Sequence, residues 1–210
     1  MNWTDLPKTE ESNVDPEILF LHYESVLDNS DYVFNTVKME IGSRSLMEPS
    51  ENVSIRSIIG ELLPTSDFAD SAFFVQAVLP KRTFLEKAFL LHELFQKGIH
   101  GNDIKRMSRH LYDLEKLMDS EYCKDALKDS NLYNEIISHR RMFTSVANVD
   151  YATHQPSSIN FTPPESVLKE WERDYFAMQE NMIYGKSLSF QELIGRIREL
   201  NKRFNLTTFL

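Results

Sequence analysis

The stretch Lys81-Arg-Thr-Phe-Leu-Glu-Lys-Ala-Phe-Leu-Leu-His-Glu93 marks the point at which the chain changes from strand-like to helical patterning. Its apolar residues recur at intervals of three and four, which is the spacing of one face of an α-helix. Thr83 and Glu86 have the spacing of a capping box, so we expect a helix to begin there and to run to about Lys97, before Gly98.

The region before this stretch, residues 1–79, is predicted to form strands. Short apolar or alternating segments separated by turn residues favour strands at residues 17–23, 33–41, 53–59 and 73–79. The first of these is a continuous apolar run, which is typical of a strand buried on both faces. Four strands with little helix between them predict a small or partial sheet.

The region after it is predicted to be helical. Further helices are expected at about residues 104–118, 131–147, 163–182 and 190–200, and the cap sequences Thr162-Pro-Pro-Glu165 and Ser189-Phe-Gln-Glu192 open the last two. A proline-containing segment from Asn148 to Phe161 is the expected flexible link. The pattern therefore predicts an α+β fold, with a β-rich region at 1–79 followed by an α-helical domain at 80–210.

Composition and charge exclude several classes of protein. The 210 residues have a formal charge of −9, and residues 1–79, with 4 basic against 14 acidic residues, account for −10 of it, while residues 80–210 have a net charge of +1. This argues against nonspecific nucleic-acid binding by the whole chain. The apolar runs are too short to span a membrane, and Met1-Asn-Trp-Thr-Asp5 does not resemble the start of a secretion signal. The single Cys123 excludes an internal disulfide, so we expect a cytoplasmic protein.

Lys87 is the first candidate for chemistry. Projected at 3.6 residues per turn, it lies on the apolar side of its predicted helix, beside Phe84, Leu91 and Leu94. An unpaired ammonium group is unfavourable there, so it must reach solvent, pair with a carboxylate or face a bound anion. A structural ion pair and an anion site are both open.

The next predicted helix has a basic face, made by Lys105, Arg106, Arg109 and Lys116, with Asp113 among them. The common interpretation of this spacing is a solvated face with salt bridges. The alternative is a basic wall for phosphates, in which one carboxylate accepts a hydrogen bond or helps to hold a divalent metal.

Lys38 and Glu40 lie on the polar face of the second predicted strand. A carboxylate there suits Mg²⁺, which prefers oxygen ligands. Alternating charges are also common on exposed sheet faces. The sequence contains no phosphate-binding Gly-x-x-x-x-Gly-Lys loop, no dinucleotide fingerprint and no zinc-ligand spacing.

Several ordered segments resemble the AbiEii/MenT nucleotidyltransferase toxins of abortive-infection and toxin–antitoxin systems. The segments are Val37-Lys-Met-Glu-Ile-Gly-Ser-Arg-Ser-Leu46, Arg82-Thr-Phe-Leu-Glu-Lys-Ala-Phe-Leu-Leu-His-Glu93, Arg109-His-Leu-Tyr-Asp-Leu114 and, near the C-terminus, Trp171-Glu-Arg-Asp-Tyr175 and Ser189-Phe190.

The resemblance implies a partial nucleotidyltransferase-like sheet followed by a helical C-terminal domain. It implies an enzyme that binds an NTP with Mg²⁺ and transfers a nucleotide to an acceptor, tRNA in some relatives, together with an antitoxin partner. The positions that match the family assign Lys87 and Asp113 to catalysis, Lys38, Arg82 and Arg109 to nucleotide binding, and Glu40 to the metal.

One family motif has no match here. The family's glycine turn followed by Asp-x-Asp is absent, because no Asp-x-Asp follows Gly42-Ser43 and the spacing of Asp67-Phe-Ala-Asp70 is wrong. Those carboxylates hold the metal that positions the reacting phosphate. We therefore expect the C-terminal part of such a transferase, inactive as this chain alone. The alternatives are a non-enzymatic module that dimerises across an exposed sheet or binds an antitoxin-like protein, and an RNA-binding helical domain.

Overall fold

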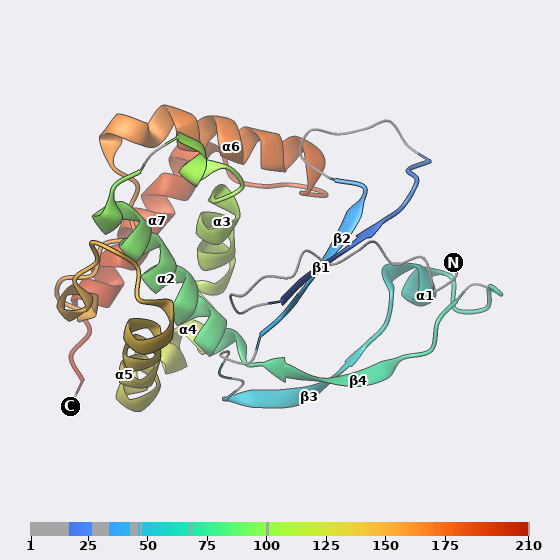
Figure 1. Ribbon diagram of the computed structural model, residues 1–210, viewed down its shortest axis with the longest axis horizontal. Coiled ribbons are helices and arrows are strands. Elements are labelled where there is room, and N and C mark those ends of the chain that lie inside the picture. Colours follow the sequence, from blue (N-terminus) through green and yellow to red (C-terminus); the bar gives the residue numbers. More distant parts are fainter. Residues whose placement is uncertain are drawn as a thin grey trace.

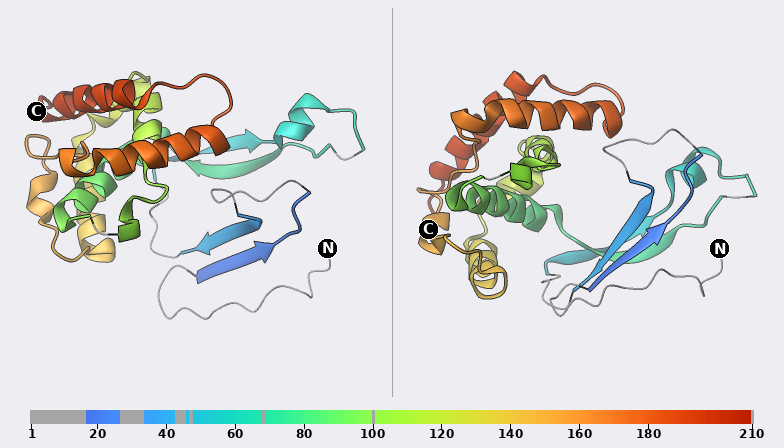
Figure 2. Two further views of the ribbon diagram at one scale, coloured as in Figure 1. Left: turned by 90° about the horizontal axis from the view of Figure 1, so that it is seen from above. Right: turned by 45° about the horizontal axis from the view of Figure 1, so that its top comes forward.

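The protein combines a helical body with two β-hairpins that extend to one side of it (Figures 1 and 2). The computed structural model describes residues 17–26, 34–42, 46, 48–67, 69–99 and 101–209. This arrangement confirms the predicted α+β fold with a helical C-terminal part. Residues 1–16, to which the expectation about secretion applies, and Val33, the expected start of the second strand, lie outside the described residues.

The strands form two separate antiparallel pairs. β1 (Glu17–His22) pairs with β2 (Thr36–Ile41), and β3 (Ser50–Ile55) pairs with β4 (Phe73–Val78). The expectation that the first strand is buried on both faces is wrong, since Phe20 is 46% exposed. A two-stranded sheet has too few neighbours to cover both of its faces.

The third predicted strand ends earlier than the sequence pattern suggests. Residues 53–59 were expected to be extended, but α1 (Ile58–Leu62) begins within them. The Ser57 side chain accepts a hydrogen bond from the Gly60 backbone N–H at 2.9 Å, and this cap starts the helix. The short polar cap therefore overrides the β-propensity of Ile58 and Ile59.

In the described residues, the helical body contains six α-helices and several short turns. The α-helices are α2 (Pro80–Lys97), α3 (Ser108–Leu117), α4 (Glu121–Ala126), α5 (Ser130–His139), α6 (Leu168–Asn181) and α7 (Phe190–Asn205). The turns are the 3₁₀ segments η2 (Gly101–Ile104), η4 (Tyr151–His154) and η5 (Glu165–Val167), and the π-helical segment η3 (Arg140–Thr144).

The predicted helix boundaries hold at some ends and fail at others. The capping box at Ser189 and Glu192 is present and opens α7. The capping box predicted at Thr83 is wrong, because α2 begins at Pro80 and Thr83 lies inside the helix. Proline at the first helical position has no N–H to satisfy and a backbone angle that already suits a helix, so it starts α2 without a side-chain cap.

The core belongs to the helical body. Every buried apolar side chain of the described residues lies between Phe84 and Phe204, and Phe89, Tyr133 and Trp171 are among the largest. The segment 148–161, which was expected to form a flexible link, is anchored to this core by the buried residues His154, Pro156, Ile159 and Phe161. There the Asn201 side chain accepts a hydrogen bond from the Phe161 N–H and donates one to the Ile159 carbonyl. None of the helices in the described part of the chain is long and apolar enough to span a bilayer.

Candidate functional site

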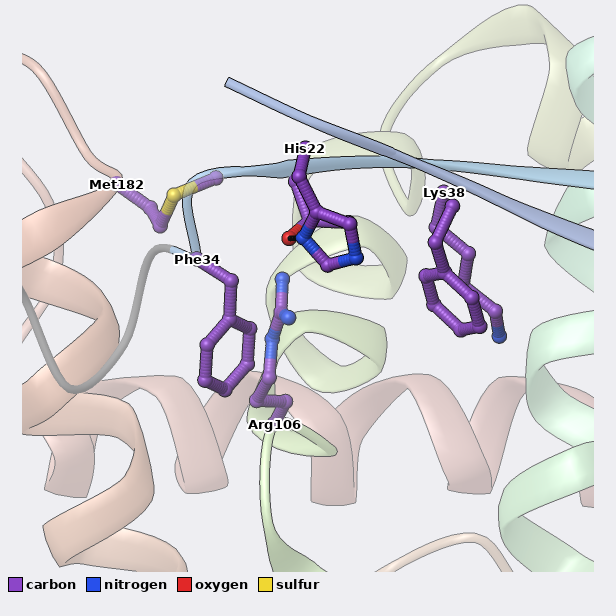
Figure 3. Close-up of a pocket in the computed structure, with 7 residues that line it drawn as sticks. His22, Phe34, Lys38, Arg106 and Met182 are labelled. Carbon is purple, nitrogen blue, oxygen red and sulfur yellow. Dashed lines mark hydrogen bonds between the residues drawn. The ribbon is translucent and has the colours of Figure 1, made fainter. Parts of the chain in front are cut away.

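A cavity of about 620 Å³ lies between the β1–β2 hairpin and the helical body (Figure 3). Its lining residues are Phe20, His22, Phe34, Thr36, Lys38, Arg106 and Met182. Five of these come from the first hairpin and two from the helical body, so the cavity exists only because the two parts meet. Its size is within the range of small-molecule sites in proteins.

The strand register explains which hairpin residues face the cavity. Phe20 lies opposite Lys38 and His22 lies opposite Thr36, so all four side chains belong to one face of the pair. The His22 Nδ1 and Thr36 Oγ1 atoms are 3.0 Å apart, which ties the two strands together at this end. Lys38 Nζ also donates a hydrogen bond to the Glu40 carboxylate, and both side chains are about half exposed.

Arg106 enters the cavity from the helical body. It lies in the turn before α3, and Figure 3 shows its guanidinium extending toward His22. Its Cζ atom is 6.0 Å from the centroid of the Phe34 ring, and Lys105 Nζ is 5.9 Å from the same centroid. Two cations therefore lie next to the face of one aromatic ring, an arrangement that is favourable for both.

Lys87 and Asp113, the two residues predicted to be catalytic, form an ion pair between α2 and α3. Their Nζ and Oδ2 atoms are 2.7 Å apart, and the side chains are 20% and 40% exposed. Lys87 Nζ also lies 3.4 Å from His110 Nδ1. The structure thus brings these two residues together and leaves the carboxylate partly open to solvent.

The surroundings of His110 keep its imidazole neutral. Burial, and then the charges of Lys87 and Arg109, lower the pKa of His110 to about 4. A neutral ring can accept a hydrogen bond from the Lys87 ammonium at Nδ1, whereas a protonated ring would repel it. His110 therefore fits a role as a support for the Lys87–Asp113 pair.

The two arginines predicted to contact the nucleotide lie in different surroundings. Arg82 is 1% exposed, donates to Glu86 Oε1 at 2.9 Å and to the Glu48 carbonyl, and lies 3.6 Å from Glu135. These contacts hold α2 to the loop before β3 and to α5 through Nε and Nη1, whereas the buried Arg82 Nη2 has no hydrogen-bond partner in the described structure. Arg109 is exposed on α3.

Glu40, the predicted Mg²⁺ ligand, is not part of a cluster of metal-binding side chains in the described residues. Nowhere within them do three or more His, Cys, Asp or Glu side chains gather at a point where they could hold a metal. Glu40, the predicted ligand, accepts a hydrogen bond from Lys38. Asp70 accepts hydrogen bonds from the backbone N–H and hydroxyl of Ser57, so it supports the start of α1. Ser43 lies outside the described residues.

Sequence reasoning missed part of the cavity. Arg106 was assigned to the basic face of a helix, but it lies before α3. His22, Phe34 and Met182 also line the cavity and were not predicted to be site residues. The alternation of β2 could have suggested that Thr36 and Lys38 share a face with their partners on β1. Nothing in the local sequence indicates that the turn before α3 meets that face.

Among known proteins, the chain matches one family model. No curated protein and no solved structure matches the chain. A family model for the nucleotidyl transferase AbiEii toxin of the type IV toxin–antitoxin system matches residues 3–196, which is most of the chain. The chain therefore belongs to the AbiEii family of nucleotidyl transferase toxins.

Proposed function

We propose that the cavity between the β1–β2 hairpin and the helical body binds a nucleoside triphosphate. The observation that carries this proposal is the meeting of Lys38 and Arg106, from two separate parts of the fold, in a cavity that also contains the rings of Phe20 and Phe34. Ammonium and guanidinium groups bind phosphate oxygens, and aromatic rings stack on bases.

Lys87 and Asp113 keep the roles proposed for them from the sequence. Neither residue lines the cavity, so the proposed contact of Lys87 with phosphate oxygens requires the triphosphate to extend from the cavity to the ion pair. The pair with Asp113 holds the ammonium group in place until the nucleotide arrives. Asp113 is the more exposed partner and can accept a hydrogen bond from a nucleotide or acceptor hydroxyl. Arg109 is exposed on α3, the helix that carries Asp113, and it would add positive charge for a bound phosphate. Arg82 is assigned no contact here, because its side chain is 1% exposed and already contacts Glu86 and the Glu48 carbonyl.

The described residues support binding better than transfer. A metal role was considered for two carboxylates, Glu40 and Asp113, and neither is part of a group of three or more metal-binding side chains in the described part of the fold. We propose that this chain alone binds the nucleotide and transfers none at a detectable rate. Incubation with each α-labelled NTP, Mg²⁺ and total tRNA tests this, and any labelled tRNA would contradict it.

Isothermal titration with the four NTPs, each with and without Mg²⁺, tests the binding proposal. We expect one NTP to bind with a stoichiometry near one, and Lys38→Ala to weaken its affinity about tenfold through loss of a charge-assisted contact. Lys124→Ala is the matched control, because Lys124 is an exposed lysine that pairs with Glu121 on α4. The absence of binding by the unaltered chain would refute the proposal.

The family relationship supports a proposal for the acceptor and for the location. We propose tRNA as the acceptor, reached from the basic side of α3, and the cytoplasm as the location, where NTPs and tRNA are present. Binding of tRNA through this side should weaken steeply with salt. An electrophoretic shift that is identical at 50 mM and 200 mM salt would count against it.

A second candidate function is supported by the second hairpin. The apolar arm, which consists of β3, α1 and β4, exposes the large side chains of Ile55, Ile58, Ile59, Leu62, Leu63, Phe73 and Phe74. Together they leave on the order of several hundred Å² of apolar surface open. An isolated hairpin is only marginally stable, so a partner that covers the arm would stabilise it. The candidate is a module that dimerises or binds an antitoxin-like protein.

Sedimentation velocity separates this candidate from the first. A dimer that Phe74→Lys together with Ile58→Lys converts to a monomer would support it, because both positions are 74% exposed and tolerate charge in a monomer. Leu206→Lys, at an 82% exposed position after α7, is the control. A concentration-independent monomer that does not associate with its antitoxin would exclude it.

A further inference from the structure

The turn that presents Arg106 to the cavity is held by a side chain from another helix. Asp174 on α6 accepts a hydrogen bond from the Arg106 backbone N–H at 2.5 Å through Oδ1. Its second oxygen, Oδ2, accepts from the Ser108 N–H at 2.9 Å and from the Ser108 hydroxyl at 2.6 Å. One carboxylate therefore binds both backbone N–H groups that flank Met107 at the start of α3.

These bonds hold Arg106 in an unusual backbone conformation. Its φ angle is +63°, in the left-handed region that residues with a Cβ atom seldom adopt. Such a conformation persists when surrounding contacts impose it. A left-handed residue turns the chain sharply, and here the turn directs the Arg106 side chain out of the helical body and into the cavity (Figure 3).

The carboxylate also suits the helix end that it caps. The first N–H groups of a helix lack intrahelical partners, and a negative charge beside them is favourable. α3 has no side-chain cap from its own preceding residue, Met107. Asp174, 66 residues further along the chain than Ser108, supplies that cap from α6 instead.

We infer that Asp174 is a positioning residue for nucleotide binding, which acts by fixing the Arg106 turn so that the guanidinium points into the cavity before the nucleotide arrives. This inference rests on the proposed function of the cavity and adds a residue that does not touch the ligand. It places the control of affinity partly in α6, outside the segments from which the nucleotide contacts were predicted.

A double-mutant cycle in the full chain tests the inference. Asp174→Asn keeps the size of the side chain but replaces one accepting oxygen with a donor, and Arg106→Gly removes the guanidinium while accommodating the positive φ angle. Titration with the four NTPs should show about a tenfold loss of affinity for Asp174→Asn in the unaltered background. In the Arg106→Gly background the same change should alter affinity less than about twofold.

Hydrogen exchange supplies a second readout that needs no nucleotide. Asp174→Asn should speed amide exchange at Arg106 and Ser108 and leave α7 unchanged. Asp125→Asn, on the exposed side of α4, makes the same chemical change and should alter neither affinity nor exchange at these amides.

The possible outcomes are distinct. Equal losses of affinity in both backgrounds would show that Asp174 acts on the fold as a whole. No loss in the unaltered background would show that Asp174 does not act on binding. Either result overturns the inference about Asp174 and leaves the proposed function of the cavity intact. A chain that binds no NTP in any form refutes the proposed function and, with it, this role. Unchanged exchange at Arg106 and Ser108 would overturn the structural premise.

Discussion

At the scale of single residues, the most heavily buried charges lie away from the cavity. Glu93 on α2 is 2% exposed, and it accepts hydrogen bonds from Arg140 Nε at 2.7 Å and Nη2 at 2.6 Å. His154 Nε2, which is fully buried, lies 3.1 Å from the same carboxylate. Burial acts to raise the pKa of Glu93, but the hydrogen bonds from Arg140 and His154 outweigh it and hold that pKa below its ordinary value.

This cluster joins three segments, so its removal should destabilise the body. Glu93→Gln leaves the Arg140 guanidinium, which is 14% exposed, without its compensating charge. We expect a loss of about 3–5 kcal/mol in the free energy of unfolding, measured by urea denaturation. Glu199→Gln breaks an exposed pair with Arg203 and should cost less than about 1 kcal/mol. If both variants lowered the free energy of unfolding by the same amount, burial of the Glu93–Arg140 pair would not explain its contribution to stability.

His110 makes stability depend on pH. Because its pKa is lowered to about 4 from an ordinary 6.5, the folded state disfavours the protonated ring and the unfolded state binds more protons between these values. The contribution of the neutral His110 ring to the free energy of unfolding is therefore fully present above pH 6.5. It is lost as the pH falls toward 4, and the free energy of unfolding decreases by up to about 3 kcal/mol. Urea denaturation at pH 7.0, 5.5 and 4.5 measures this.

His110→Gln is the control for that pH dependence. It should reduce the slope between pH 6.5 and 4 without abolishing it, because burial also lowers the pKa of His92, which contributes in the same direction. A slope that His110→Gln leaves unchanged would show that His110 titrates normally in the folded chain.

At the scale of elements, local signals account for the helices to different degrees. The Ser189 hydroxyl accepts from the Glu192 N–H, while the Glu192 carboxylate accepts from the Ser189 N–H, so four adjacent residues specify the start of α7. The six-residue α4 was not predicted, because it is too short for a clear periodic pattern. The predicted 131–147 helix ends at His139 and continues as the π-helical η3, up to Ser145 with its positive φ angle.

The α7 cap should be measurable by itself. Ser189→Ala removes the acceptor for the Glu192 N–H and should lower the free energy of unfolding by about 1 kcal/mol. Ser138→Ala, at an exposed position within α5, should be neutral or slightly stabilising because alanine favours helix interiors. Chemical denaturation of both variants gives the comparison, and equal changes would exclude a capping contribution.

At the scale of the whole molecule, the two predicted regions differ in how they are stabilised. In the described structure the buried apolar core lies between Phe84 and Phe204, whereas the hairpins expose Phe20, Phe73 and Phe74. The second hairpin is joined to the body by contacts such as the hydrogen bond that Arg82 on α2 donates to the Glu48 carbonyl at 2.5 Å. The domain boundary proposed near residue 80 stays a prediction, and the first buried apolar side chain of the described core is that of Phe84.

This difference predicts which part folds alone. A fragment of residues 80–210 should retain helical circular dichroism and unfold cooperatively in urea, because it keeps the whole core. A fragment of residues 1–79 should show no cooperative transition, since isolated two-stranded hairpins bury too little apolar surface. A helical fragment without a cooperative transition would refute the proposed division.

The sequence by itself determined the class of fold, the change from strands to helices near residue 80, the cap of α7 and the identity of the family. These features depend on residues within a few positions of one another, or on ordered motifs that can be compared directly. Lys87 and Asp113 were also selected from sequence, and the structure brings them within 2.7 Å.

Only the tertiary structure decided which charged groups share a space. It buried Arg82 against Glu86 and Glu48, placed Lys38 and Arg106 in one cavity, and set Asp174 under the turn of Arg106. These pairs are separated by up to 68 residues, and their contact depends on how helices and hairpins pack. Local periodicity indicates that a face is polar or apolar, but it carries no information on which distant face will meet it.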